Sequence, residues 1–332
     1  MVITRTPFRV SFFGGGTDRY EWFSENEGGV LSCTIDKYCY LTLRKLPPFF
    51  EHKHRIVYSK VENVTDIDDI KHPVVREVFR YLAVVEGKEL HHDGDLPAGS
   101  GLGSSSSFTV GLLMALSALR GRFASKKWLA DTAIYIEREL LKEAVGMQDQ
   151  IAVAQGGFNH IKFKKDGKYR VNPVLVNGSD KSELESHLML FFTGISRFSS
   201  DISKSQIDKI EQKREKYSKL TLLLDDALRL FGKDYLCIKD FGSLLNESWL
   251  IKRALSDSVT NERVDLMYQK AIECGAYGGK LTGAGGGGFM LICAPPEKHT
   301  RIKEALYPNI YVPFKFENSG SSVIYFDSEL GA

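Results

Sequence analysis

The sequence lacks the features that would point to a membrane, an oxidising compartment or a nucleic acid. Its five cysteines form no CxxC pair and no metal-ligand spacing, which is typical of reduced thiols in a cytoplasm. The first residues, MVITRTPFRV, contain no basic segment followed by an apolar one, so we expect no signal peptide. No apolar run approaches the roughly 20 residues that span a bilayer. A formal net charge of +2 gives no reason to expect nucleic-acid binding. We therefore expect a soluble, cytoplasmic protein.

The length and the order of the patterns indicate two domains of mixed α+β structure. A chain of 332 residues is longer than a single core usually serves. Strand-like and helix-like segments alternate without a regular βαβ rhythm, so α+β is favoured over a doubly wound sheet. The character changes after the polar stretch NGSDKSELES, which places the boundary between domains 1–180 and 181–332. The expected elements are strands in 3–13, 28–35 and 38–46, helices over 107–119 and 126–144, a hairpin at Asp166-Gly167, and long helices near 200–231, 238–255 and 261–275.

Glycine is plentiful, and 11 of the 30 glycines lie in three loops. The loop DLPAGSGLGSSSS, residues 95–107, runs directly into an apolar helix. Its glycines let backbone N–H groups curl around a phosphate, and the helix start adds free N–H groups and a positive dipole end. It has neither the GK[ST] ending of a Walker A loop nor the GxGxxG spacing of a dinucleotide loop. The alternative, a flexible linker, fits poorly beside an amphipathic helix.

The other two glycine loops are GGGTD (14–18) and GAGGGG (283–288). The second of these matches GxGxxG as a string, but the strand FMLICA follows it where a dinucleotide site needs a helix. A dinucleotide-dependent oxidoreductase is therefore disfavoured. Five glycines in a connection between strands indicate close approach of the backbone to a ligand.

Two acids and one arginine are candidates for chemistry beside these loops. On the helix from Ser125, Glu137 falls at the edge of an apolar stripe, where it must find a cation or a hydrogen-bond donor, or else form a structural salt bridge. Asp149 follows in GMQDQ. Arg9 lies in the apolar strand FRVSFF and either faces solvent or points inward to a carboxylate or a phosphoryl group. Together with a phosphate loop, the acids suggest one Mg²⁺ ligand and one group near a reacting hydroxyl.

TPFRVSFFGGGTD, LPAGSGLGSSSS and KLTGAGGGGF, in this order, resemble the three motifs of the GHMP kinase superfamily, named for galactokinase, homoserine kinase, mevalonate kinase and phosphomevalonate kinase. The resemblance spans almost the whole chain. The GGGTD variant, LFFTGISR and GGKLTGAGGGGF are most similar to the bacterial D-glycero-D-manno-heptose 7-phosphate kinases, with fucokinases as the nearest competitors. The resemblance to GHMP kinases implies an N-terminal ribosomal-protein-S5-domain-2-like domain that carries the ATP loop and a C-terminal ferredoxin-like domain.

The resemblance also implies roles for single residues. Asp149 would lie by the acceptor hydroxyl with Arg9 beside it, and Ser105 and Glu137 would bind Mg²⁺. Arg197, from TGISRFSS, is our candidate for holding a phosphate on the substrate, with Arg19 and Lys37 as alternatives. The loop residues expected to bind ATP are Pro97, Gly99, Gly101, Leu102, Gly103, Ser104, Ser105, Ser106 and Ser107. Those expected to bind substrate are Gly15, Gly16, Thr17, Asp18, Gly283, Ala284, Gly285 and Gly286.

The expected function is an ATP- and Mg²⁺-dependent sugar kinase. It would phosphorylate the anomeric hydroxyl of D-glycero-D-manno-heptose 7-phosphate to the 1,7-bisphosphate, for nucleotide-activated heptose synthesis. The expected partners are ATP and a small sugar phosphate, and self-association as a homodimer is compatible with the sequence. Two alternatives remain: a fucokinase-like sugar 1-kinase that acts on a free sugar, and a non-catalytic sugar- and ATP-binding regulator.

Overall fold

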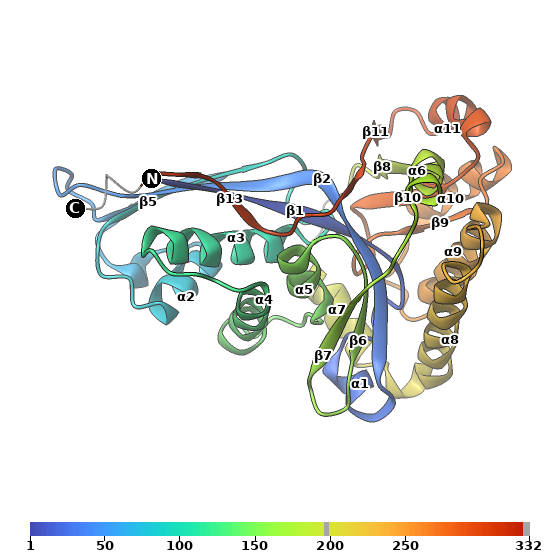
Figure 1. Cartoon of the computed structure of the whole chain (residues 1–332), viewed down its shortest axis with the longest axis horizontal. Helices are drawn as coiled ribbons and strands as arrows, with labels where there is room; N and C mark the ends of the chain where they lie inside the picture. The colour runs from blue at the N-terminus through green and yellow to red at the C-terminus, as the bar shows by residue number, and fades with distance from the viewer. Residues whose placement is uncertain (196–198, 328–332) are drawn as a thin grey trace.

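The computed structural model describes residues 1–195 and 199–327 and contains two β-sheets with helices packed against them. In Figure 1 the larger sheet extends from the end of the molecule where the chain begins, and the smaller sheet lies at the opposite end with helices around it. Helices and sheets are mixed, as expected for an α+β protein. None of the helices in the described ranges is long and apolar enough to cross a membrane.

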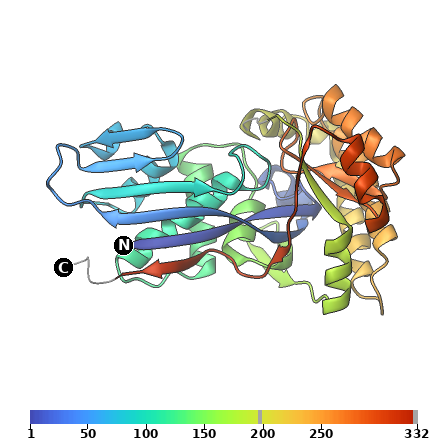
Figure 2. The same cartoon turned by 90° about the horizontal axis from the view of Figure 1, so that it is seen from above.

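The larger sheet is organised around one long strand. Strand β2 (Gly28–Lys45) pairs with four others and combines the two strands expected over 28–46. Its β-branched and aromatic residues suit a pleated, buried surface. Figure 2 shows the strands from above with the helices behind them. The remaining strands of this sheet are β1 (Val2–Phe13), β3 (His54–Val57), β4 (Val61–Val64), β5 (Lys88–Gly94), β6 (Phe158–Phe163), β7 (Tyr169–Pro173), β12 (Phe316–Glu317) and β13 (Ser322–Phe326).

A bulge between β1 and β2 lies directly before Arg9. The register moves from Pro7↔Tyr38 to Phe8↔Ile35, which leaves two extra residues on β2. Such bulges bend a strand and re-aim its side chains. Every residue of β1 from Thr6 to Phe13 is buried, so that Arg9 lies inside the protein whichever face of the strand it occupies. Sequence alternation leaves its direction open, and the structure shows that it points inward.

Helices cover one face of this sheet (Figure 1). The sequence predicts α3 closely, and Ser125 caps α4 by accepting a hydrogen bond from the backbone N–H of Trp128 at 3.1 Å. The single helix predicted over 126–144 is wrong in its second half, because the chain passes into a π-helical turn, η2, after Tyr135. These elements are η1 (Ile67–Asp69), α2 (Pro73–Tyr81), α3 (Ser104–Leu119), α4 (Lys126–Tyr135), η2 (Ile136–Leu140) and α5 (Gln148–Gln155), with α1 (Tyr20–Asn26) between β1 and β2.

The smaller sheet has the order β11-β8-β10-β9 and its own apolar core. Its strands are β8 (Leu188–Phe192), β9 (Gly278–Leu281), β10 (Phe289–Cys293) and β11 (Ile310–Val312). The accompanying helices are α6 (Gly178–His187), α7 (Ser199–Ile207), η3 (Glu211–Lys213), α8 (Arg214–Leu230), α9 (Ile238–Arg253), α10 (Glu262–Glu273), η4 (Pro296–Lys298) and α11 (His299–Ala305). Helix α6 was not expected in the polar stretch before residue 187.

The end of the chain returns to the larger sheet. Strand β13 pairs with β1, β12 pairs with β2, and the amino group of Met1 donates to the carbonyl of Asp327 at 3.0 Å. A boundary between 180 and 181 therefore puts two strands of the first sheet in the second segment. The division into domains 1–180 and 181–332 stays a prediction. It does not account for β12 and β13, which lie after residue 181 but pair with strands of the larger sheet.

An aromatic cluster joins the two parts. The Phe241 ring, from α9, packs edge-on against the rings of Phe12 and Phe13 of β1, with centroids 5.5 and 5.3 Å apart. Phe241 is fully buried. Its contacts tie a helix of the second part to the strand that carries Arg9.

We expect Phe241→Ala to lower the free energy of unfolding by about 3–5 kcal/mol, because it leaves a cavity between α9 and β1. The measurement is a denaturant titration of purified protein. Leu250→Ala, at a half-exposed position of the same helix, is the control and should change stability by less than about 0.5 kcal/mol. Equal effects of the two substitutions would contradict the role of this cluster.

Candidate active site

Two hydrogen bonds fix the second half of the glycine–serine loop to strand β1. The backbone N–H of Arg9 donates to the carbonyl of Leu102 at 2.9 Å, and the Ser107 hydroxyl donates to the carbonyl of Pro7 at 2.9 Å. Leu102 is fully buried and anchors the loop. Gly103 adopts the left-handed conformation, φ 77°, and is the N-cap of the 16-residue helix α3. The free N–H groups of the first turn of α3 therefore lie at the end of a rigid loop, as an anion site requires.

The second glycine loop packs directly on the first. A Cβ at Gly283 would lie 2.5 Å from the Cα of Gly101, and one at Gly288 would lie 2.3 Å from the carbonyl oxygen of Ser100. Side chains at these positions would separate the loops, which explains why glycine is needed here. The backbone of Ala284 is held by the side chain of Gln206, which donates to its carbonyl at 2.8 Å.

Arg9 and Asp149 form a two-pronged ion pair beside this contact. The Arg9 Nε and Nη2 atoms donate to the two carboxylate oxygens of Asp149 at 2.8 and 2.6 Å. A third N–H, on Nη1, donates to the carbonyl of Gly101 at 2.7 Å. The Arg9 side chain is 3% exposed and that of Asp149 is 28% exposed, so the carboxylate is open to a ligand while its partner is not. This geometry fixes the orientation of the Asp149 carboxylate.

Asp18, in the GGGTD loop after β1, lies next to this pair, and its carboxylate contacts the first residue of α5. Its carboxylate accepts hydrogen bonds from the backbone N–H groups of Gly16, at 3.0 Å, and Gln148, at 3.3 Å. Gly146 approaches so closely that a Cβ there would lie 1.8 Å from Asp18 Oδ2. Burial raises the pKa of Asp18, the Arg19 charge lowers it, and the Asp149 charge raises it further. The GGGTD loop and the start of α5 thus bring the carboxylates of Asp18 and Asp149 close to each other.

Glu137 is buried under α3 in the π-helical turn. It accepts hydrogen bonds from the hydroxyls of Ser106 and Thr109 at 3.0 and 2.7 Å. The side-chain amide of Gln150 donates to the same carboxyl at 2.5 Å. Burial raises the pKa of Glu137 to about 7, although these donors act in the opposite direction. The prediction that this acid needs donors or a cation is confirmed, and the partners are donors.

Comparison with known proteins identifies the family. The models of the GHMP kinase N-terminal and C-terminal domains match residues 70–157 and 229–311. The chain is 33% identical over 315 residues to the D-glycero-alpha-D-manno-heptose 7-phosphate kinase of Campylobacter jejuni, covering 91% of this chain and 92% of that protein. The chain belongs to the GHMP kinase family. It is therefore a phosphotransferase with an alcohol group as acceptor, and GHMP kinases use ATP as the phosphate donor.

Two further proteins are similar over most of this chain. The chain is 27% identical to the bifunctional fucokinase/GDP-fucose pyrophosphorylase of Arabidopsis thaliana, over 90% of this chain but only 30% of that longer protein. The crystal structure of a D-glycero-D-manno-heptose 1-phosphate kinase from Bacteriodes thetaiotaomicron superimposes with a TM-score of 0.76 at 24% identity, covering 99% of this chain and 100% of that one. This likeness confirms the predicted two-domain α+β fold of GHMP kinases.

In this GHMP kinase, the donor set around Glu137 fits Mg²⁺. No ion pair to Glu137 is found within residues 1–195 and 199–327, so its carboxyl group has no cationic partner there. The amide oxygen of Gln150 is buried without a hydrogen-bond partner in the described structure. The same ranges contain no cluster of three His, Cys, Asp or Glu side chains that could hold a metal alone. Mg²⁺ is usually held by one or two carboxylates together with the substrate's phosphates, which one acid and the serine hydroxyls would match.

The serine predicted to share the metal with Glu137 does not touch it here. Ser106 contacts Glu137, whereas Ser105 is exposed on the first turn of α3 and Ser104 is half-buried. Adjacent residues on a helix point about 100° apart, so Ser105 and Ser106 lie on different faces of α3 and only Ser106 faces Glu137. The assignment of Ser105 to the metal stays a prediction, and Ser106 is the hydroxyl that the structure places against the acid.

The other predicted substrate contacts have different surroundings. The Thr17 hydroxyl is buried within hydrogen-bond distance of the carbonyl oxygens of Gly14 and Gly29, at 2.7 and 2.9 Å, so it holds the GGGTD turn together. Arg19 donates to the carbonyl of Ser203 and the side chain of Gln206, and Lys37 pairs with its neighbour Asp36. Arg197 lies outside the described residues.

Two buried lysines escaped sequence reasoning. Lys252 continues the buried stripe of α9, at helical spacing after Leu245, Ser248 and Trp249, and its ammonium group donates to the carbonyl of Gly283. Lys280 lies in the fully buried strand β9 and donates to the carbonyl of Phe12 at 2.8 Å. Lysine is rarely buried without a partner, so its position on the buried stripe of α9 is the signal that could have identified Lys252 from the sequence.

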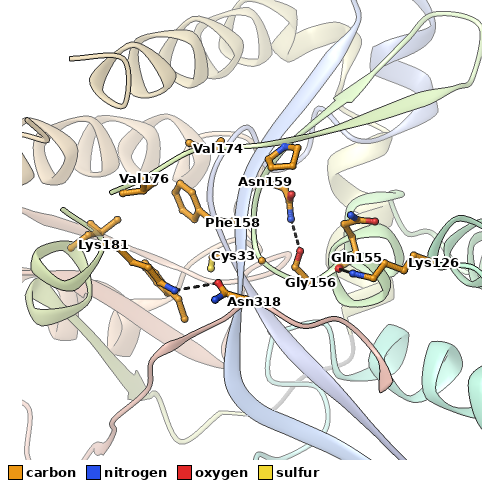
Figure 3. A pocket seen from close by; sticks show the side chains of 14 residues that line it. Cys33, Lys126, Gln155, Gly156, Phe158, Asn159, Val174, Val176, Lys181 and Asn318 are labelled. Atoms are coloured by element: carbon orange, nitrogen blue, oxygen red, sulfur yellow. Dashed lines mark hydrogen bonds between the residues drawn. The ribbon is translucent and has the colours of Figure 1, made fainter. Parts of the chain in front are cut away.

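A separate cavity lies at the other end of α5. It encloses about 340 Å³, and its lining includes Phe158, Val174, Lys181 and Asn318 (Figure 3). It begins at Gln155, about two helical turns beyond Asp149. None of its lining residues belongs to the predicted site.

We expect Glu137→Gln to raise the Mg²⁺ concentration needed for half-maximal activity by roughly tenfold or more, because it removes the charge and keeps the side chain's shape. The measurement is an ADP-release assay titrated with Mg²⁺. Glu139→Gln, on the same turn but exposed, is the control. An unchanged titration for Glu137→Gln would remove this residue from the metal site.

Proposed function

We propose that this GHMP kinase is an ATP- and Mg²⁺-dependent sugar kinase that phosphorylates the anomeric hydroxyl of D-glycero-D-manno-heptose 7-phosphate. The product would be the 1,7-bisphosphate, an intermediate suited to the synthesis of nucleotide-activated heptose. The observation that carries the proposal is the position of Asp149, partly exposed and held by Arg9, next to Asp18 and beside the two glycine loops. The heptose 7-phosphate kinase of Campylobacter jejuni, similar over nine-tenths of both chains, supports this choice of substrate.

Asp18 and Asp149 have different roles toward the sugar. Asp18 accepts hydrogen bonds from hydroxyls of the ring and holds it in place. Asp149 accepts the hydrogen bond of the reacting hydroxyl. As the hydroxyl oxygen bonds to the γ-phosphorus, the bond from that phosphorus to ADP breaks and the hydroxyl proton passes to a carboxylate oxygen of Asp149.

Arg9 makes this arrangement rigid. With two N–H groups on Asp149 and a third on the carbonyl of Gly101, it sets the distance between the acceptor hydroxyl and the phosphate loop. Positioning of this kind supplies much of the acceleration in phosphoryl transfer, since the transition state has little covalent chemistry for the protein to perform.

The triphosphate would lie along the loop from Pro97 to Ser107, with the N-terminus of α3 against its oxygens. Glu137 and a serine hydroxyl of the same turn, predicted to be Ser105, would hold Mg²⁺, which neutralises phosphate charge when bound. Gly283, Ala284, Gly285 and Gly286 would close on the phosphates from the other side, while Arg197 is proposed to hold the 7-phosphate.

A fucokinase-like activity is the second candidate. The similarity to the plant fucokinase protein favours it, because a free sugar would need the same Asp18 and Asp149 but no handle for a second phosphate. A non-catalytic regulator is disfavoured by the complete set of Arg9, Asp149 and Glu137 contacts.

The deciding experiment is ADP release across heptose 7-phosphate, free heptose, fucose and galactose, with phosphorus NMR of each product. We expect the heptose 7-phosphate to have the highest kcat/KM and to give a new signal from an anomeric phosphate. Heptose 1-phosphate, whose anomeric oxygen is blocked, is the matched control and should not react. If a free sugar reacts faster than every sugar phosphate, the substrate assignment is wrong.

We expect Asp149→Asn to lower turnover by a factor of roughly 10²–10⁴ while ATP binding survives, because the proton acceptor is lost but the loop remains. The measurements are single-turnover kinetics and ATP-binding calorimetry. Asp240→Asn, which also replaces an acid in the first turn of a helix but on the surface, should leave turnover unchanged. Near-normal turnover of Asp149→Asn would exclude it from the reaction.

A further inference from the structure

The site contains buried basic side chains that no carboxylate pairs with in the described residues. Arg9 is paired with Asp149, and Arg19 is bound to the side chain of Gln206. Lys252 and Lys280 are 6% and 2% exposed, yet the acceptors found for them in the described structure are backbone carbonyls. A buried ammonium group without an anion is costly, so this arrangement favours the binding of a negatively charged group.

Lys252 is placed at the contact between the two glycine loops. Its ammonium group donates to the carbonyl of Gly283, which packs on Gly101 of the phosphate loop. The carbonyl of Gly101 in turn accepts from Arg9. Lys252 on α9 and Arg9 on β1 therefore approach the same loop contact from different parts of the fold. An ammonium group has three donors, so the hydrogen bond to Gly283 leaves two for a ligand.

The charged groups that act on Lys252 belong to the same site. Arg9 and Arg19 oppose its protonation, Asp18 and Asp149 favour it, and its charge acts in turn on Lys280. Burial is the largest effect, and it lowers the pKa of Lys252 to about 7. Burial also lowers the pKa of Lys280 well below its usual value.

The glycine–serine loop has no lysine of its own, unlike a Walker A loop. We propose that Lys252 supplies this missing cation by contacting the phosphoryl group that passes from ATP to the acceptor hydroxyl. Arg9 supplies the neighbouring positive charge. The inference extends the proposed function and depends only on phosphoryl transfer from ATP, whichever sugar accepts the group.

This role has a consequence that a structural role lacks. In the free protein at pH 8, a group with a pKa of about 7 is mostly neutral. A phosphate against Lys252 favours the charged form and raises its pKa, so binding draws a proton from solution. A lysine that only tethers the Gly283 loop would take up no proton when the γ-phosphate arrives.

The experiment is calorimetry of the full-length protein at pH 8 in two buffers of different ionisation enthalpy, with Mg²⁺ present. The ligands are ADP, a β,γ-imido analogue of ATP, and ADP with the sugar phosphate. For the wild type, we expect the ATP analogue to take up roughly 0.5–0.9 proton more than ADP. We expect this excess to be lost in Lys252→Met and retained in Lys239→Met, an exposed lysine of the same helix.

Kinetics give the second measurement, with the fastest sugar of the substrate panel as acceptor. Lys252→Met should lower kcat by roughly 10²–10³, as the loss of one charged contact to a transition state does, with a smaller change in the KM for ATP. Lys252→Arg should recover part of this loss without taking up a proton, since arginine remains charged.

Two results would overturn the proposal. One is an equal proton uptake with ADP and with the ATP analogue in the wild type, which needs no variant to fold. The other is a proton uptake that appears only with the sugar phosphate, which would assign Lys252 to the acceptor's own phosphate. Failure of the heptose assignment would appear in the substrate panel and would leave these measurements interpretable.

Discussion

The rest of the site depends on the packing of Gly101 against Gly283. Because neither position has room for a side chain, the phosphate loop and the second glycine loop touch through their backbones. The carbonyl groups at this contact are the acceptors for Arg9 and Lys252. One close approach of two backbones therefore positions the cations, and through Arg9 it positions the carboxylate of Asp149. The site forms only when the parts of the chain that carry the two loops are packed together.

This dependence gives a functional reason for the way the two parts are joined. The aromatic contacts of Phe241 with Phe12 and Phe13 fix α9 against β1, the elements that carry Lys252 and Arg9. Strands β12 and β13 return to the larger sheet after the smaller one is complete. The chain thus crosses between the two parts more than once. These crossings hold the two parts, and the glycine loops that they carry, at a fixed separation.

The parts of the site that could be predicted are those with a local sequence signal. Glycine patterns identified the loops, and the helical period placed Glu137 at the edge of a buried stripe. The direction of Arg9 could not be predicted, because β1 is buried on both faces beyond its bulge. The choice between Ser105 and Ser106 depends on how α3 is rotated against the π-helical turn, which is a tertiary property. Helix α6 was missed because Leu184 is its one buried residue and its stability comes from docking and an Asn177 cap.

Lys252 shows why a motif alone understates a site of this kind. In a Walker A loop the cation belongs to the loop, so the string that binds the phosphate also supplies the charge. Here the loop supplies backbone donors, while the positive groups come from β1, α9 and β9, far apart in sequence. Each of these basic residues lies in a buried stretch of its helix or strand, where the sequence pattern predicts an apolar residue. Such exceptions at the meeting point of glycine loops are explained by the anion that the loops are built to hold, because that ligand offsets the cost of burying the charge.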